Sequence, residues 1–113
     1  MAETGDLAQL FCEHGEVEEL EFGDKFYLHL AERATYEKHQ FTSQEVLEVH
    51  QGQPRYFENT GAGRRAPIIM VGPTLAGRFL GVPLVPAGRF GVWRPLTGFQ
   101  ANTNDVTRYL ASH

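Results

Sequence analysis

The chain has 113 residues, a formal net charge of −4 and a single cysteine, Cys12. That length suits one domain (1–113), the 42% of hydrophobic residues argues against intrinsic disorder, and one cysteine excludes an internal disulfide. No apolar run approaches the roughly 20 residues of a membrane span, and the acidic N-terminus lacks the basic start of a secretory signal. We therefore expect a cytoplasmic protein that does not enter a membrane.

The charge is divided unevenly between the two halves of the chain. Residues 1–53 carry three basic and twelve acidic side chains, a net of −9, whereas residues 54–113 carry seven and two, a net of +5. All seven basic residues of the second half are arginine, whose planar guanidinium suits phosphate binding and base stacking. A biased genome composition would give the same usage, so two explanations stay open.

The chain starts with a predicted helix and a predicted strand. A short helix is predicted over residues 6–14 and ends at Gly15. The alternation of apolar and acidic residues over 16–22 predicts a strand.

Two consecutive helices are predicted next. Asp24 is a good N-cap for a helix over 25–39, in which apolar residues recur on one stripe. Thr42 and Glu45 form a capping box for a second helix over 43–50. Because their connection is very short, the two helices should form a hairpin.

The second half is predicted to be an antiparallel β meander. Glycine-containing turns separate four β-like runs, at residues 55–59, 66–72, 77–86 and 89–99. Pro83 and Pro95 cannot donate to a ladder, so each should lie at an edge, a bulge or a strand end.

A last helix and the overall fold class follow from this order. Asn102 caps the helix, and Val106, Tyr109 and Leu110 share one face of it. We predict an α+β fold, in which an N-terminal strand and a two-helix hairpin pack on a four-stranded antiparallel sheet that a short C-terminal helix follows.

The stretch 59–67, NTGAGRRAP, raises the question of phosphate binding. A dinucleotide fingerprint needs a third glycine and a following helix, and a Walker loop needs Gly-Lys-Ser/Thr, but both are absent. The glycines are therefore predicted to form a hairpin turn. Arg64 and Arg65 would project from this turn into solvent, either gripping phosphate or simply solvated.

Histidine offers one candidate for proton transfer. His39 ends the first predicted hairpin helix, where it would either interact with the helix dipole or act as an acid or base. No histidine or cysteine spacing fits a zinc motif, and no G-x-S-x-G elbow occurs. We expect no metal and no cofactor.

The remaining candidates lie on the predicted sheet and the last helix. Trp93 beside Arg94 suits base stacking together with phosphate binding. Alternatively, Trp93 fills the core, and this is the favoured interpretation. Arg78, Arg89 and Arg108 would extend a basic face, or each would be a solvated surface residue.

Three segments, residues 32–49, 72–86 and 91–110, resemble the BrnT-type toxins of the RelE/ParE superfamily. The first is similar to a helix that ends in Lys-His before a Ser/Thr-capped helix, and the second is similar to a Gly-Arg-led central strand. The third is similar to a last strand, a pair of small residues and a closing helix that ends in Tyr. Their order carries the resemblance, which covers a core of about residues 20–110 and implies that residues 1–16 are an N-terminal extension.

The resemblance implies a RelE-like fold and a small cytoplasmic ribonuclease that a partner antitoxin holds inactive. Lys38 and His39 match the Lys-His pair, Arg78 starts the central strand, Arg94 lies in the last strand, and Tyr109 closes the chain. The family usually places an arginine directly after the small pair of its last strand.

The first functional hypothesis is therefore a metal-independent endoribonuclease. The 2′-oxygen of RNA would attack the adjacent phosphate, arginines would stabilise the developing charge, and His39 or Tyr109 would transfer protons. The predicted catalytic residues are His39, Arg78, Arg94 and Tyr109. The predicted RNA-binding residues are Arg64, Arg65, Arg89, Trp93 and Arg108.

The second hypothesis is a non-catalytic module of the same fold. Its basic sheet would bind an acidic protein, or the acidic half of a second copy in a homo-oligomer. Phe99 motivates this hypothesis, because it follows Thr97 and Gly98 at the position where the family usually has arginine. A related expectation is that the acidic residues of 1–22 shield part of the arginine face.

Overall fold

The computed structural model describes residues 2–24, 26–28, 41–59 and 66–111, and these form an α+β fold with a mixed sheet. The described helices are α1 (Ala2–His14), α3 (Ser43–Gln51) and α4 (Thr103–Ala111). The described strands are β1 (Glu19–Leu20), β2 (Arg55–Glu58), β3 (Ile68–Pro73), β4 (Phe79–Pro86), β5 (Val92–Pro95) and β6 (Phe99–Gln100). Asp24 and residues 26–28 are helical, and the rest of the helix predicted over 25–39 lies outside the described residues.

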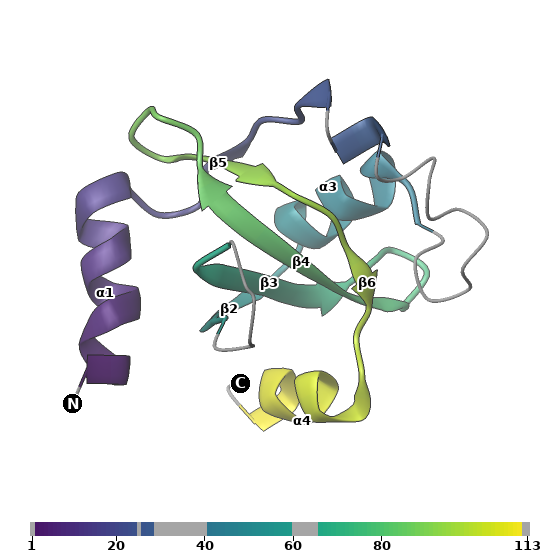
Figure 1. Cartoon of the computed structure of the whole chain (residues 1–113). Coiled ribbons are helices and arrows are strands. Elements are labelled where there is room, and N and C mark those ends of the chain that lie inside the picture. Colours follow the sequence, from purple (N-terminus) through teal and green to yellow (C-terminus); the bar gives the residue numbers. More distant parts are fainter. Residues whose placement is uncertain (1, 25, 29–40, 60–65, 112–113) are drawn as a thin grey trace.

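The sheet differs from the predicted four-stranded antiparallel meander. Its strands follow the order β1-β5-β4-β3-β2, and β6 pairs with β4 beside this path (Figure 1). Every described pair is antiparallel except β1 with β5, which are parallel. The prediction was wrong because the N-terminal strand joins the sheet at β5, and because the last β-like run divides into β5 and β6.

Proline explains why the last run divides. On one side of β4, Leu80–Gly81 pair with β6 and Leu84–Pro86 pair with β5. Pro83 lies between these two stretches, and its carbonyl accepts the Leu96 N–H at 3.0 Å. Because Pro83 has no N–H, it cannot donate a ladder hydrogen bond on this side of β4. The pairings with β6 and with β5 therefore stop on either side of it.

The two faces of the sheet are covered by different helices. A Cβ on Gly72 would point at Val49 of α3, 3.1 Å away, so Gly72 and its partner Leu80 face α3. Phe79, the neighbour of Leu80, turns to the opposite face and packs on Tyr109 of α4, with ring centroids 5.3 Å apart. Hereafter these are the α3 face and the α4 face, and Figure 1 shows the two helices on opposite sides of the sheet.

The main core lies under α3. Its fully buried side chains alternate along β3 and β4, as expected for strands with one face on a core. They comprise Val46, Val49, Ile68, Met70, Leu80, Val82, Leu84 and Trp93.

Two of the three helix caps that the sequence predicts are present, at Thr42 and Asn102, whereas Asp24 lies within a helix. The Thr42 side chain accepts the Glu45 N–H at 3.1 Å, and Glu45 Oε1 accepts the Thr42 N–H at 3.0 Å. Asn102 Oδ1 accepts the Asp105 N–H at 2.8 Å. The predicted apolar face of α4 is narrower than expected, because its last member, Leu110, is 60% exposed.

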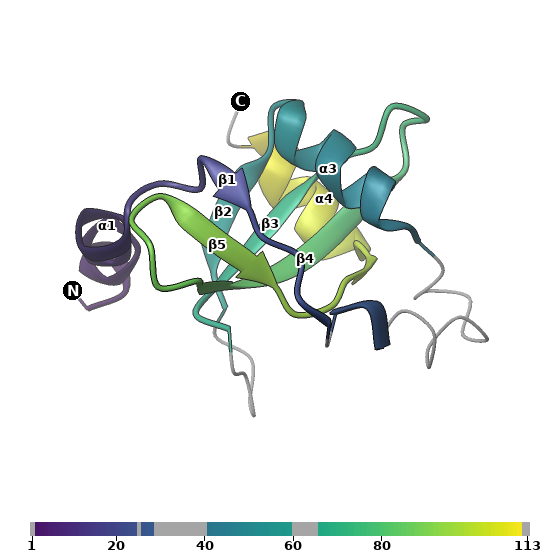
Figure 2. The same cartoon turned by 90° about the horizontal axis from the view of Figure 1, so that it is seen from above.

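The predicted N-terminal extension packs against the core rather than standing apart from it. The ring of Phe11 in α1 meets the rings of Tyr56 and Trp93 edge-on, with centroids 5.9 and 6.0 Å apart. At the end of α1, the Gly15 carbonyl accepts the indole N–H of Trp93 at 3.0 Å. Figure 2 shows α1 beside the loop that joins β4 to β5.

This docking requires glycine at position 15. Gly15 has φ +83°, and a Cβ there would lie 2.5 Å from the backbone nitrogen of Gly91. Gly88 has a similar φ of +91° but open space around it. We expect Gly88→Ala to lower the free energy of unfolding by about 1 kcal/mol through backbone strain alone. Gly15→Ala should cost about 3 kcal/mol or more, because the clash adds to that strain.

Urea unfolding followed by circular dichroism measures both costs. Equal decreases in the two variants would show that the close approach of Gly15 and Gly91 contributes nothing.

Tyr56 makes the free energy of unfolding depend on pH in the alkaline range. Burial, and then the negative charge of Glu16, raise the pKa of Tyr56 from its ordinary 10 to about 12. Above pH 10 the unfolded chain loses this proton before the folded protein does, so the stabilisation is complete below pH 10 and is lost as the pH rises toward 12. The free energy of unfolding should therefore fall less steeply over this range in Tyr56→Phe than in the wild type.

Candidate functional site

Alternation along the strands places Arg94 on the α4 face. Arg94 pairs with Val85, whose neighbour Leu84 belongs to the α3 face. The side chain of Arg94 is 45% exposed, whereas Trp93 and Pro95 on either side of it are buried. Arg94 is therefore the residue that β5 presents to solvent.

Arg94 and Arg89 hold the same carboxylate. Nη2 of Arg94 donates to Oε1 of Glu21 at 2.8 Å, and Nη2 of Arg89 lies 3.7 Å from Oε2 of Glu21. Glu21 follows β1, and its own N–H donates to the Trp93 carbonyl at 2.9 Å, which fixes it beside β5. Two arginines from one β hairpin thus converge on one anionic group, and we call these three residues the Arg89–Glu21–Arg94 cluster.

An exposed aromatic residue directly follows Arg89 in the chain. Phe90, between Arg89 and Gly91 at the tip of the β4–β5 loop, is 71% exposed. Sequence reasoning missed Phe90, and it included Glu21 only as one of the acidic residues of 1–22 that were expected to shield the arginine face. The glycines at 88 and 91, which both have positive φ, were the available signal that Phe90 would lie at a loop tip.

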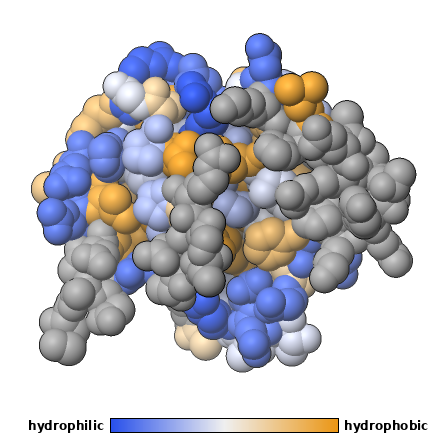
Figure 3. All heavy atoms as spheres, viewed as in Figure 1, coloured by the Kyte–Doolittle hydropathy of each residue, from blue (hydrophilic) through white to orange (hydrophobic). Residues whose placement is uncertain are grey.

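A row of half-buried apolar residues crosses the α4 face beside the cluster. Phe57 pairs with Ile69, Ile69 pairs with Pro83, and Val85 lies two residues further along β4, next to Arg94. Figure 3 shows hydrophobic residues reaching the surface over the middle of the molecule, between hydrophilic ones.

Arg108 lies at the other end of this row. Its guanidinium carbon is 4.2 Å from the centre of the Phe57 ring, a cation–π contact. From β2, which carries Phe57, to β5, which carries Arg94, there are three strand spacings, or roughly 14 Å. The two arginines therefore flank an apolar surface a few nucleotides wide.

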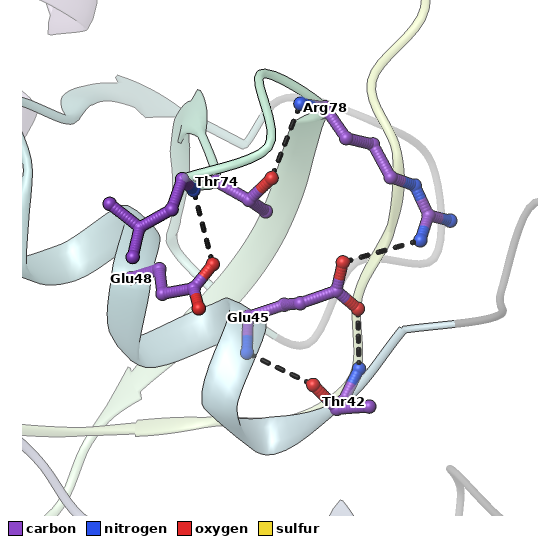
Figure 4. A network of polar contacts seen from close by, with 6 residues as sticks. Thr42, Glu45, Glu48, Thr74 and Arg78 are labelled. Atoms are coloured by element: carbon purple, nitrogen blue, oxygen red, sulfur yellow. Dashed lines mark hydrogen bonds and ion pairs between the residues drawn. The ribbon is translucent and has the colours of Figure 1, made fainter.

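Arg78 belongs to a different part of the molecule. Nη1 of Arg78 lies 3.7 Å from Oε2 of Glu45 in α3, and Glu45 also completes the capping box with Thr42 (Figure 4). The same view shows Glu48 and Thr74 holding the β3–β4 turn against α3: Glu48 accepts the Leu75 N–H and Thr74 accepts the Arg78 N–H.

Arg78 and Arg94 do not form one catalytic centre. They lie on opposite faces of the sheet, and seven residues separate Arg78 from Val85, the partner of Arg94. At a rise of about 3.3 Å per residue this is roughly 23 Å along β4. One phosphate cannot be held by both.

Two other predicted site residues are packed into the fold. The hydroxyl of Tyr109 donates to the Gln53 carbonyl at 2.8 Å, and its side chain is only 5% exposed, which argues against proton transfer to a substrate. Trp93 is fully buried, so it has no face to offer a base and the core role is the correct one.

Three predicted residues, His39, Arg64 and Arg65, lie outside the described residues. The hairpin predicted around 59–67 is present, because β2 and β3 pair and Asn59 Nδ2 donates to the Ala66 carbonyl at 2.9 Å. The structure therefore answers the question about NTGAGRRAP only for the base of the hairpin.

Other site types find no support in the described part of the chain. No cluster of three histidine, cysteine or acidic side chains there could hold a metal ion. Within the same residues, no helix is long and apolar enough to cross a membrane. Comparison with protein-family models, with curated proteins and with solved structures gives no significant match.

The fluorescence of Trp93 tests its assignment to the core. It is the single tryptophan of the chain, so its emission can be read directly. We expect a blue-shifted maximum and little quenching by iodide, because the indole is shielded and hydrogen-bonded to the backbone. Strong iodide quenching, relieved by RNA, would instead restore Trp93 as a stacking residue.

Proposed function

We propose that the α4 face binds single-stranded RNA, with Arg89 and Arg94 as its main phosphate contacts. The convergence of two guanidiniums on one carboxylate carries the proposal. Guanidinium forks bind carboxylate and phosphate oxygens with the same geometry. A group of donors that holds Glu21 is therefore suited to hold a phosphodiester.

The surroundings of the cluster favour single strands over duplex. Phe90 offers an exposed ring, and Ile69, Pro83 and Val85 offer a partly exposed apolar surface on which unpaired bases can lie. Sequence-tolerant stacking combined with arginine contacts is typical of proteins that bind single-stranded nucleic acid. Arg108 would supply a second phosphate contact across the row.

The resemblance to BrnT-type toxins extends the proposal to a RelE-like fold and to RNA cleavage in the cytoplasm. In this mechanism the 2′-oxygen loses its proton and attacks the adjacent phosphate, the bond from phosphorus to the 5′-oxygen breaks as that oxygen is protonated, and Arg94 stabilises the charge that develops on the phosphate. His39 remains the proposed acid or base. Arg78 and Tyr109 are left out of the reaction centre, and an antitoxin would cover the α4 face.

The alternative is a module that binds an acidic protein through the same arginines. Phe99 supports it, because its ring lies against the backbone: a Cβ on Gly81 would be 2.7 Å from it. The residue at the position where the family usually has arginine therefore packs on the sheet. The two proposals predict different ligands for one surface.

Variants that replace arginine with uncharged glutamine distinguish a localised phosphate site from an effect of the overall charge of the protein. We expect the double variant Arg89→Gln/Arg94→Gln to bind a labelled single-stranded RNA about tenfold or more weakly at low salt. The slope of log K against log salt should also become shallower, by about 0.7 for each phosphate that the variant no longer neutralises. Arg78→Gln, on the α3 face, is the matched control for the single variant Arg94→Gln, because each removes one positive charge and breaks one arginine–glutamate pair.

Fluorescence anisotropy gives the affinities, and a denaturing gel of the same mixtures shows whether the RNA is cut. Equally weakened binding in Arg94→Gln and in Arg78→Gln would show that binding is not localised to the α4 face. Binding of polyglutamate but not of RNA would favour the protein-binding alternative.

A further inference from the structure

Glu21 occupies the position that a phosphate would take between Arg89 and Arg94. Each of its two carboxylate oxygens faces one of the guanidiniums, at 3.7 Å and 2.8 Å. Its backbone is held beside β5 by the hydrogen bond from the Glu21 N–H to the Trp93 carbonyl. The carboxylate is therefore held near the two arginines, and an external anion must compete with it for them.

Glu21 can nevertheless give way. Its side chain is 38% exposed, and exposed pairs of this kind hold their partners by only a few tenths to about 1 kcal/mol. The aliphatic part of Arg94 passes close to Gly23, because a Cβ added at that glycine would lie 3.5 Å from Cδ of Arg94.

We propose that Glu21 is a built-in competitor that weakens phosphate binding at this site until a ligand displaces it. The proposal rests on the proposed RNA-binding function for its physiological ligand, but the competition itself concerns any phosphate. It differs from general repulsion by an acidic N-terminal half, because one carboxylate in contact with the two arginines carries it.

Glu19 provides the control that isolates direct pairing from charge. Glu19 lies in β1, two residues before Glu21. Because side chains alternate along the strand, Glu19 is on the same side of the sheet as Glu21. Among the described residues it forms no ion pair with an arginine, and it is exposed. Glu19→Gln and Glu21→Gln therefore change the net charge equally, and only the second frees Arg89 and Arg94.

The experiment uses two ligands, single-stranded RNA measured by anisotropy and pyrophosphate followed by NMR of the arginine Nε–H groups. We expect Glu21→Gln to bind each about threefold to tenfold more tightly than the wild type, with Glu19→Gln changing either by less than about twofold. Thermal unfolding of each variant confirms that both remain folded.

The outcomes separate the two proposals. Equally tighter binding by Glu19→Gln and Glu21→Gln, or unchanged binding by both, would overturn the role of Glu21. Tighter pyrophosphate binding that is specific to Glu21→Gln, without RNA binding by any form of the protein, would support the competition and reject RNA as the ligand.

Discussion

The packing of Trp93 is the constraint on which the rest of the structure depends. Its indole fills the core under α3, its N–H is bound by the carbonyl of Gly15, and its backbone pairs with Leu20 on one side and Pro86 on the other. Because a buried indole N–H is costly to leave unpaired, this one side chain draws the end of α1 onto the sheet. The same strand then presents Arg94 on its other face.

Side chains alternate along β5, so core residues and the exposed Arg94 lie on opposite faces of the strand. One face of the strand completes the core, and the other carries a guanidinium that is open to solvent and pairs with Glu21. A strand that faces two environments in this way holds its exposed side chain rigidly, since the buried neighbours fix the backbone. Arg94 is therefore better positioned for recognition than an arginine on a loop would be.

The opposite charges of the two halves of the chain meet in the folded protein. Glu21 from the first half pairs with both Arg89 and Arg94, and Glu45 from the first half pairs with Arg78. These pairs do not form one electropositive surface, because the pair of Arg78 lies on the α3 face. What remains on the α4 face is a smaller basic site, at one end of an apolar row, with Arg108 at the other end.

The sequence alone determined the local features, because these depend on residues close together in the chain. The capping box of Thr42 and Glu45, the cap at Asn102, the β hairpins and the interruption at Pro83 follow from side chains within a few residues of one another. It also favoured the buried role of Trp93.

Only the tertiary structure decided which distant residues meet. The parallel pairing of β1 with β5 joins segments more than seventy residues apart in the chain, and that pairing alone brings Glu21 to Arg94. Likewise, the assignment of Arg78 and Arg94 to opposite faces needed the observed register, because Pro83 and Pro95 obscure the alternation in the sequence. Local patterns specify elements, whereas the site arises from long-range pairing, which no short stretch of sequence encodes.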